Sequence, residues 1–201
     1  MTDAINDLAP RIQISDIRAE ARRTPGTPMV LYLSGKHENG ADCAACTRFE
    51  ATQRSTLNAN RNDVDFRQVQ IPLTFPAFQE LATSLGGTID ERGTMTFPGS
   101  PPVTINAGTP LLLHIVAGQD GNPRVVGALS PDPRNPEAVG AWINQVESGN
   151  RALTSAARAA TSPNCPVGSD AVSFDPSSLS RPVAAATGGC QISGGGRGTR
   201  N

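Results

Sequence analysis

Three strand-length apolar segments, separated by segments with helical patterns, constrain the fold of this chain most strongly. Residues 29–33 and 110–116 are nearly continuous apolar runs, which is typical of strands buried on both faces of a sheet. Residues 64–71 alternate between polar and apolar side chains over most of their length. Consecutive strands that are joined through helices usually run parallel, with right-handed crossovers. The order therefore predicts an α/β fold.

Helical patterns surround these strands. We expect four helices, over residues 16–23, 43–57, 76–85 and 136–148. Asp42 precedes the second of them as a candidate N-cap residue, and Pro136 stands in the first turn of the last. Gly149 is expected to end the last helix, because glycine commonly follows a helix C-terminus.

The remaining segments complete the predicted sheet. Residues 11–14 indicate a short first strand, and residues 124–129 should pair antiparallel with the third apolar strand across a glycine-rich turn. Residues 87–108 are polar and predict a surface hairpin or loop. His114 lies within an apolar strand, which indicates a hydrogen-bonded core residue. Together these elements predict a central mixed sheet with helices on both faces.

Composition divides the chain of 201 residues into two parts. Residues 151–201 are dominated by Ala, Ser, Thr, Gly and Pro and carry five Arg and two Asp. Such a segment buries too little apolar area to offset the entropy lost on ordering it. We therefore predict a domain at residues 1–150 and an irregular, low-complexity C-terminal extension at residues 151–201.

Two short motifs in the predicted domain carry a family resemblance. Cys43-Ala-Ala-Cys46 opens a helix that follows a buried strand, and Thr109-Pro110 begins the strand before the last hairpin turn. In this order, the two motifs resemble those of the thioredoxin-like superfamily over roughly residues 11–149. The resemblance implies a thioredoxin-like fold in which the Thr109–Pro110 peptide bond is cis and faces the two cysteines.

The resemblance also implies a chemistry. A helix N-terminus stabilises a thiolate, so Cys43 would be the exposed attacking nucleophile. Cys46 lies one turn further and would resolve the mixed disulfide, while the backbone beside Pro110 would pair with an extended substrate segment. The first functional hypothesis is therefore a thiol–disulfide oxidoreductase that acts on a protein substrate with no cofactor and no metal.

Two departures from the family pattern keep a second hypothesis open. Thioredoxins have an aromatic residue before the first cysteine, where this chain has Asp42. They also have a buried acid in the preceding strand, where this chain offers only Tyr32 as an ionisable residue. The alternative is a structural or docking component of a larger assembly, such as a virion or a multi-subunit complex. Its Cys-x-x-Cys motif would then be non-catalytic, and its tail would contact neighbouring subunits.

The other two cysteines, Cys165 and Cys190, belong to the extension. One reading is a structural disulfide that pins the extension into a loop, and free thiols are the other. A third alternative is a zinc site made of all four cysteines, although the 25-residue spacing of this pair is unlike that of zinc knuckles.

Charge and hydropathy exclude several partners. The formal net charge is −1, so no strong field favours nucleic acid or a membrane surface. No apolar run approaches the roughly 20 residues of a membrane-spanning helix. Residues 1–10 lack the apolar core of a secretory signal, which predicts a cytoplasmic protein or a component of a particle assembled inside the cell.

Overall fold

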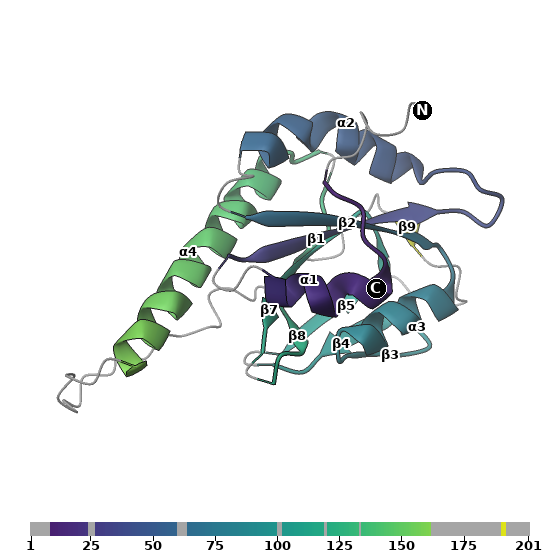
Figure 1. Ribbon diagram of the computed structural model, residues 1–201. Coiled ribbons are helices and arrows are strands. Elements are labelled where there is room, and N and C mark those ends of the chain that lie inside the picture. The colour runs from purple at the N-terminus through teal and green to yellow at the C-terminus, as the bar shows by residue number, and fades with distance from the viewer. Residues whose placement is uncertain are drawn as a thin grey trace, which may run out of the picture.

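A computed structural model gives the fold of the protein for residues 9–23, 27–59, 64–99, 102–118, 120–132, 134–161 and 190–191. Its central feature is a four-stranded mixed sheet in the order β2-β1-β7-β8 (Figure 1). The strands are β1 (Met29–Lys36), β2 (Asp65–Pro72), β7 (Leu111–Ala117) and β8 (Pro123–Leu129). β1 and β2 run parallel, whereas β7 is antiparallel to both β1 and β8. The predicted α/β class and mixed sheet are confirmed.

Helices cover both faces of this sheet (Figure 1). They are α1 (Ile17–Arg23), α2 (Ala44–Ala59), α3 (Phe75–Ser84) and α4 (Glu137–Thr161). Successive side chains of a strand point to opposite faces. Leu31 and Leu33 of β1 therefore pack into one apolar cluster with α1 and α3, and Val30 and Tyr32 pack into a second with α2 and α4.

The start of the chain is less regular than predicted. The expected strand over residues 11–14 is reduced to a single parallel bridge between Arg11 and Gln68 of the edge strand β2. A 3-10 turn, η2 (Ile14–Asp16), then leads directly into α1. Only Ile12 and Gln13 separate that bridge from η2, so this segment rests on the sheet edge without extending it.

The segment predicted to be a surface hairpin or loop forms a second, three-stranded antiparallel sheet. Its strands are β3 (Thr88–Ile89), β4 (Thr94–Phe97) and β5 (Val103–Asn106). Met95 and Phe97 of β4 are almost completely buried and join the cluster on the α1 and α3 face. The polar composition concealed this arrangement because only alternate residues of β4 face the core.

The last helix continues beyond its predicted end. α4 runs through Gly149 to Thr161, so the expectation that Gly149 ends it is wrong. A single helical glycine costs only about 1 kcal/mol relative to alanine, and the sequence after it is rich in alanine. α4 thus crosses the predicted domain boundary at residue 150.

One short ladder connects the domain to its extension. β6 (Gly108–Thr109) pairs antiparallel with β9 (Cys190–Gln191), so that Thr109 lies opposite Cys190. Residues 162–189 and 192–201 lie outside the part of the chain that the structure describes, and Cys165 is among them. The predicted irregular structure of residues 162–189 and 192–201 is therefore untested. The predicted Cys165–Cys190 disulfide is untested as well, because Cys165 lies among these residues.

His114 differs from its expectation. It lies on β7 opposite Val30 of β1 and is only 4% exposed. No donor or acceptor among the described residues hydrogen-bonds its Nε2, so the predicted hydrogen-bonded core histidine is only partly satisfied. Burial lowers the pKa of His114 from 6.5 to about 4, because the charged imidazolium would lose its hydration.

Candidate functional site

The junction between β1 and α2 places the first cysteine. β1 ends at Lys36, a tight turn follows, and Cys43 stands immediately before the first residue of α2. The Cys43 N–H donates to the Gly35 carbonyl oxygen at 3.1 Å, which ties the start of α2 to the end of β1. Cys43 Sγ accepts the Cys46 N–H at 3.3 Å. Cys43 therefore occupies the N-cap position that we had predicted for Asp42.

The two cysteines are in different chemical states. Cys43 is disulfide-bonded, whereas Cys46 is a free thiol, so the two are not bonded to each other. Cys43 is fully buried and Cys46 is 3% exposed. The expected exposure of Cys43 is therefore wrong, whereas its expected role as the nucleophile stays a prediction. The sequence motif gave no sign of this burial, because exposure depends on what covers the helix N-terminus.

Thr109 contacts the Cys43 sulfur with two of its atoms. Its hydroxyl donates to Cys43 Sγ at 3.7 Å, and its carbonyl oxygen lies 3.8 Å from the same sulfur. The following peptide bond, Thr109–Pro110, is cis, as the resemblance implied. The structure therefore brings Cys43, Cys46, Thr109 and Pro110 to one place from two separate parts of the chain.

Gly35 makes this close approach possible. A Cβ atom at this position would overlap Thr109 Oγ1 and would lie 2.5 Å from Leu73 Cδ2. Its backbone N–H also donates to Cys46 Sγ at 3.3 Å. Glycine at the end of β1 thus lets the segment before Pro110 pack directly against the cysteines.

Burial controls the acidity of Cys46. Removal from water raises the pKa of the Cys46 thiol, and hydrogen bonds from Thr109 and from the Gly35 N–H partly oppose this effect. The negative charge of Glu50 adds to the increase. Cys46 is therefore held mainly as a protonated thiol at neutral pH, and its attack on a disulfide requires a proton acceptor.

Glu50 and Tyr32 form a polar pair beside this thiol that our sequence analysis missed. The Tyr32 hydroxyl donates to Glu50 Oε1 at 2.8 Å and also makes a hydrogen bond with Cys46. Burial, and next the Glu50 charge, raises the pKa of Tyr32 far above its usual value, so the phenol stays protonated. Cys46 and Glu50 are four residues apart on α2, a spacing that places them on one helix face and could have identified Glu50.

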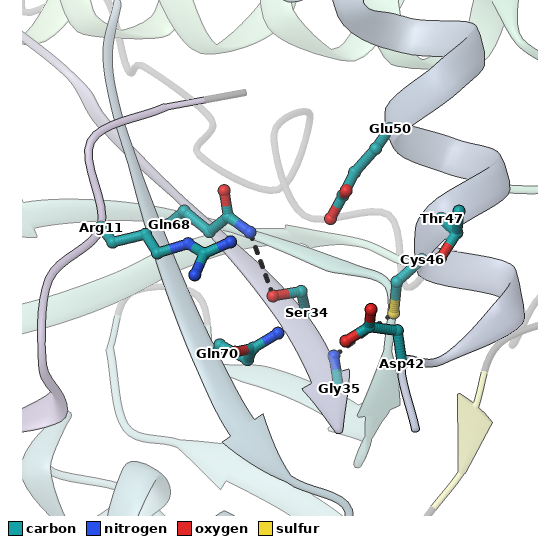
Figure 2. Close-up of a pocket in the computed structure, with 9 residues that line it drawn as sticks. All are labelled: Arg11, Ser34, Gly35, Asp42, Cys46, Thr47, Glu50, Gln68 and Gln70. Atoms are coloured by element: carbon teal, nitrogen blue, oxygen red, sulfur yellow. Dashed lines mark hydrogen bonds between the residues drawn. The ribbon is translucent and has the colours of Figure 1, made fainter. Parts of the chain in front are cut away.

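A small polar pocket reaches Cys46 (Figure 2). Residues of β1, β2, α2 and the N-terminal segment line it: Arg11, Ser34, Gly35, Asp42, Cys46, Thr47, Glu50, Gln68 and Gln70. The Gln68 amide donates to Ser34 Oγ at 3.2 Å across its floor. At about 70 Å³, the pocket has room for a few water molecules and is far below the roughly 300 Å³ of an organic ligand site. It can therefore exchange protons between solvent and Cys46.

The site does not fit a metal centre. Among the described residues, no three His, Cys, Asp or Glu side chains are grouped as metal ligands would be. A zinc ligand must be a free thiolate, and Cys43 is disulfide-bonded. The four-cysteine zinc alternative would also need the side chains of Cys165 and Cys190, which lie outside the part of the structure that is described.

No known protein family and no curated protein matches this chain in the sequence comparisons. In the part of the chain that the structure describes, none of the helices combines the length and apolar character needed to cross a membrane.

Proposed function

We propose that the protein is a thioredoxin-like thiol–disulfide oxidoreductase in which Cys43 bonds to the substrate sulfur and Cys46 resolves the resulting disulfide. One observation carries the proposal: a disulfide-bonded Cys43 lies beside a free Cys46 whose N–H contacts the Cys43 sulfur. This is the arrangement that a mixed-disulfide intermediate requires, with the resolving thiol three residues from the sulfur it must attack.

Each residue has a definite part in the resolving step. The Cys46 thiolate attacks Cys43 Sγ, the bond from Cys43 to the partner sulfur breaks, and a Cys43–Cys46 disulfide forms. The partner leaves as a thiolate and takes up a proton. In the preceding step Cys43 attacks the substrate disulfide as a thiolate, and the Cys46 N–H at the helix N-terminus would stabilise its charge.

Glu50 is placed to accept the proton that Cys46 must lose. The Tyr32 hydroxyl contacts both side chains and can pass the proton between them, and the polar pocket connects this group to solvent. Glu50 would thus supply the acid that is missing from β1. This is a proton-relay role, distinct from the covalent roles of the two cysteines.

Reduction of insulin disulfides tests the proposal. The reduced protein should catalyse the reaction, and Cys43→Ser should abolish it. Cys46→Ser should instead accumulate a covalent complex with the substrate, because the resolving step is removed. Cys165→Ser is the matched control and should retain activity. Wild-type activity no greater than that of Cys43→Ser would refute the proposal.

A second function is favoured by the complete burial of Cys43 in its bonded state. A closed site of this kind also suits a structural or docking component of a larger assembly that uses the same fold without catalysis. Under this alternative, both Cys43→Ser and wild type would be inactive on insulin. Deletion of residues 151–201 would then remove incorporation into the assembly.

A further inference from the structure

The extension supplies an extended segment to the site described above. β9 pairs antiparallel with β6, and β6 ends at Thr109, directly before the cis peptide bond. β9 also contacts α2, whose N-terminus carries Cys43. Strand addition beside a reactive group is a common way to hold a peptide, because backbone hydrogen bonds fix its register. The segment at residues 190–191 therefore occupies the position at which a peptide substrate would be held.

Thr109 connects this segment to the bonded cysteine. It lies opposite Cys190 in the ladder, and its carbonyl oxygen is 3.8 Å from Cys43 Sγ. Residues directly opposite each other in an antiparallel pair have Cα atoms about 4.5–5.5 Å apart. Thr109 is thus the backbone partner of Cys190 in the ladder and also a direct contact of Cys43 Sγ, which brings the backbone of residues 190–191 to the same part of the site.

The number of cysteines restricts the partner of Cys43. The chain has four, and Cys46 is free, so a partner within the chain is either Cys165 or Cys190. The described backbone places Cys190 beside the site. We propose that Cys190 is the disulfide partner of Cys43, and that residues 190–191 act as an internal substrate that closes the site. This inference rests on the proposed function and names the first substrate of that site.

The release of this internal substrate needs no external oxidant or reductant. The Cys46 thiolate attacks Cys43 Sγ, the Cys43–Cys190 bond breaks, and the Cys43–Cys46 bond forms. Cys190 leaves as a thiolate and takes up the proton that Cys46 lost. One disulfide and one thiol are present before and after the step, so the closed and open forms are isomers at the same oxidation level.

The environment of Cys46 slows the opening of the closed form. Its thiol is buried and protonated at neutral pH, so attack on Cys43 is slow until Glu50 takes the proton. The peptide-binding edge of β6 is meanwhile occupied by β9. An external substrate can therefore reach Cys43 only after the exchange has released residues 190–191.

Peptide mapping of the full-length protein tests the linkage. The protein is equilibrated in a glutathione redox buffer that yields one disulfide per chain, quenched with acid, alkylated and digested without reduction. The expected product joins Cys43 to Cys190, and Cys46 is alkylated. Cys46→Ser should leave this linkage as the sole product, and Cys165→Ser should leave it unchanged. Cys190→Ser should shift the disulfide to Cys43–Cys46. A Cys43–Cys165 or Cys43–Cys46 disulfide as the main wild-type product would overturn the inference.

Insulin reduction by wild type and Cys190→Ser tests the internal substrate separately from the proposed oxidoreductase function. Both proteins are assayed from their one-disulfide forms with dithiothreitol as the electron donor. If residues 190–191 close the site, Cys190→Ser should start to reduce insulin severalfold faster than wild type, because residues 190–191 do not cover its Cys43–Cys46 disulfide. Equal initial rates would refute the internal substrate even if activity depends on Cys43. A Cys43–Cys190 linkage combined with inactivity of both proteins would retain the linkage and refute the oxidoreductase function.

Discussion

The reactivity of the site is set by the surroundings of one side chain, Cys46. Its burial and the nearby Glu50 charge raise the pKa of its thiol, and the contact from the Gly35 N–H lowers it. Glu50 therefore has two opposing effects on reactivity. Its charge disfavours the thiolate, and its carboxylate offers a place for the proton. A neutral substitute of the same shape separates the two effects.

Glu50→Gln should lower the pKa of Cys46 yet slow disulfide reduction at neutral pH by about tenfold or more, because the proton acceptor is lost. Gln retains an oxygen that can accept the Tyr32 hydrogen bond, so the fold should be unchanged. The pH dependence of Cys46 alkylation reports the pKa, and insulin turnover reports the rate. Faster turnover together with the lowered pKa would show that Glu50 acts only as a charge.

His114 should make the stability of the protein depend on pH. Its pKa of about 4 in the folded state lies below the 6.5 of the free side chain, so the unfolded chain binds more protons between these values. Stability is then fully present above pH 6.5 and falls by roughly 3 kcal/mol as the pH decreases to 4.

His114→Leu should remove this contribution, and it also replaces the Nε2 atom that no described group contacts. Urea unfolding of both proteins at several pH values measures the difference, in which the carboxylates common to both cancel. Parallel pH profiles for the two proteins would contradict the predicted role of His114.

The site residues differ in how easily the sequence reveals them, because some belong to short motifs and others do not. Cys43, Cys46, Thr109 and Pro110 could be selected from the sequence because each belongs to a short motif in a definite position. The burial of Cys43 could not be predicted, because it depends on contacts with distant parts of the chain, such as Thr109, which lies 66 positions further on. Glu50 was missed because its relation to the site is a helical spacing with no motif.

At the scale of elements, strong periodicity identified the central sheet and the main helices. β1 and β7 were predictable because both faces of each strand are buried and their residues are almost all apolar. β3 and β5 were not, since each has at most four residues, and both residues of β3 and three of the four of β5 are exposed or partly exposed. Such short strands are stabilised by their neighbours rather than by their own composition.

Phe97 shows how the small sheet is held. It is 1% exposed on β4 and packs in the apolar cluster with α3. Phe97→Ala should therefore lower the free energy of unfolding by about 3–5 kcal/mol, since it removes a large buried ring. Thr96→Ala, on the exposed face of the same strand, should change it by about 1 kcal/mol or less. Chemical denaturation measures both, and equal effects would contradict the assignment of β4 to the core.

At the scale of the whole molecule, we expect the two apolar clusters to be stable without the extension. Among the residues whose burial the structure describes, those of both clusters lie between Ala9 and Val146, and they include residues of all four helices and of the sheet. β9 adds a two-residue ladder and, under our inference, one disulfide. The extension should therefore control access to the site without being required for the fold.

Deletion of residues 162–201 should leave a cooperatively folding protein with the helix and strand content of the described domain. In wild type, the proposed Cys43–Cys190 disulfide closes a loop of nearly 150 residues, and its reduction should cost roughly 5 kcal/mol of stability. The deletion leaves only the four-residue Cys43–Cys46 loop, whose reduction should cost roughly 2 kcal/mol, because a short loop restricts the unfolded chain less.

Urea unfolding with and without a reductant, followed by circular dichroism, measures both differences. Equal sensitivity to reduction in the two proteins would place the wild-type disulfide within the domain. Loss of cooperative unfolding in the deletion would show instead that the extension belongs to the core. The predicted pattern, an intact fold with a smaller effect of reduction, requires that the extension be covalently attached at Cys43 and otherwise dispensable.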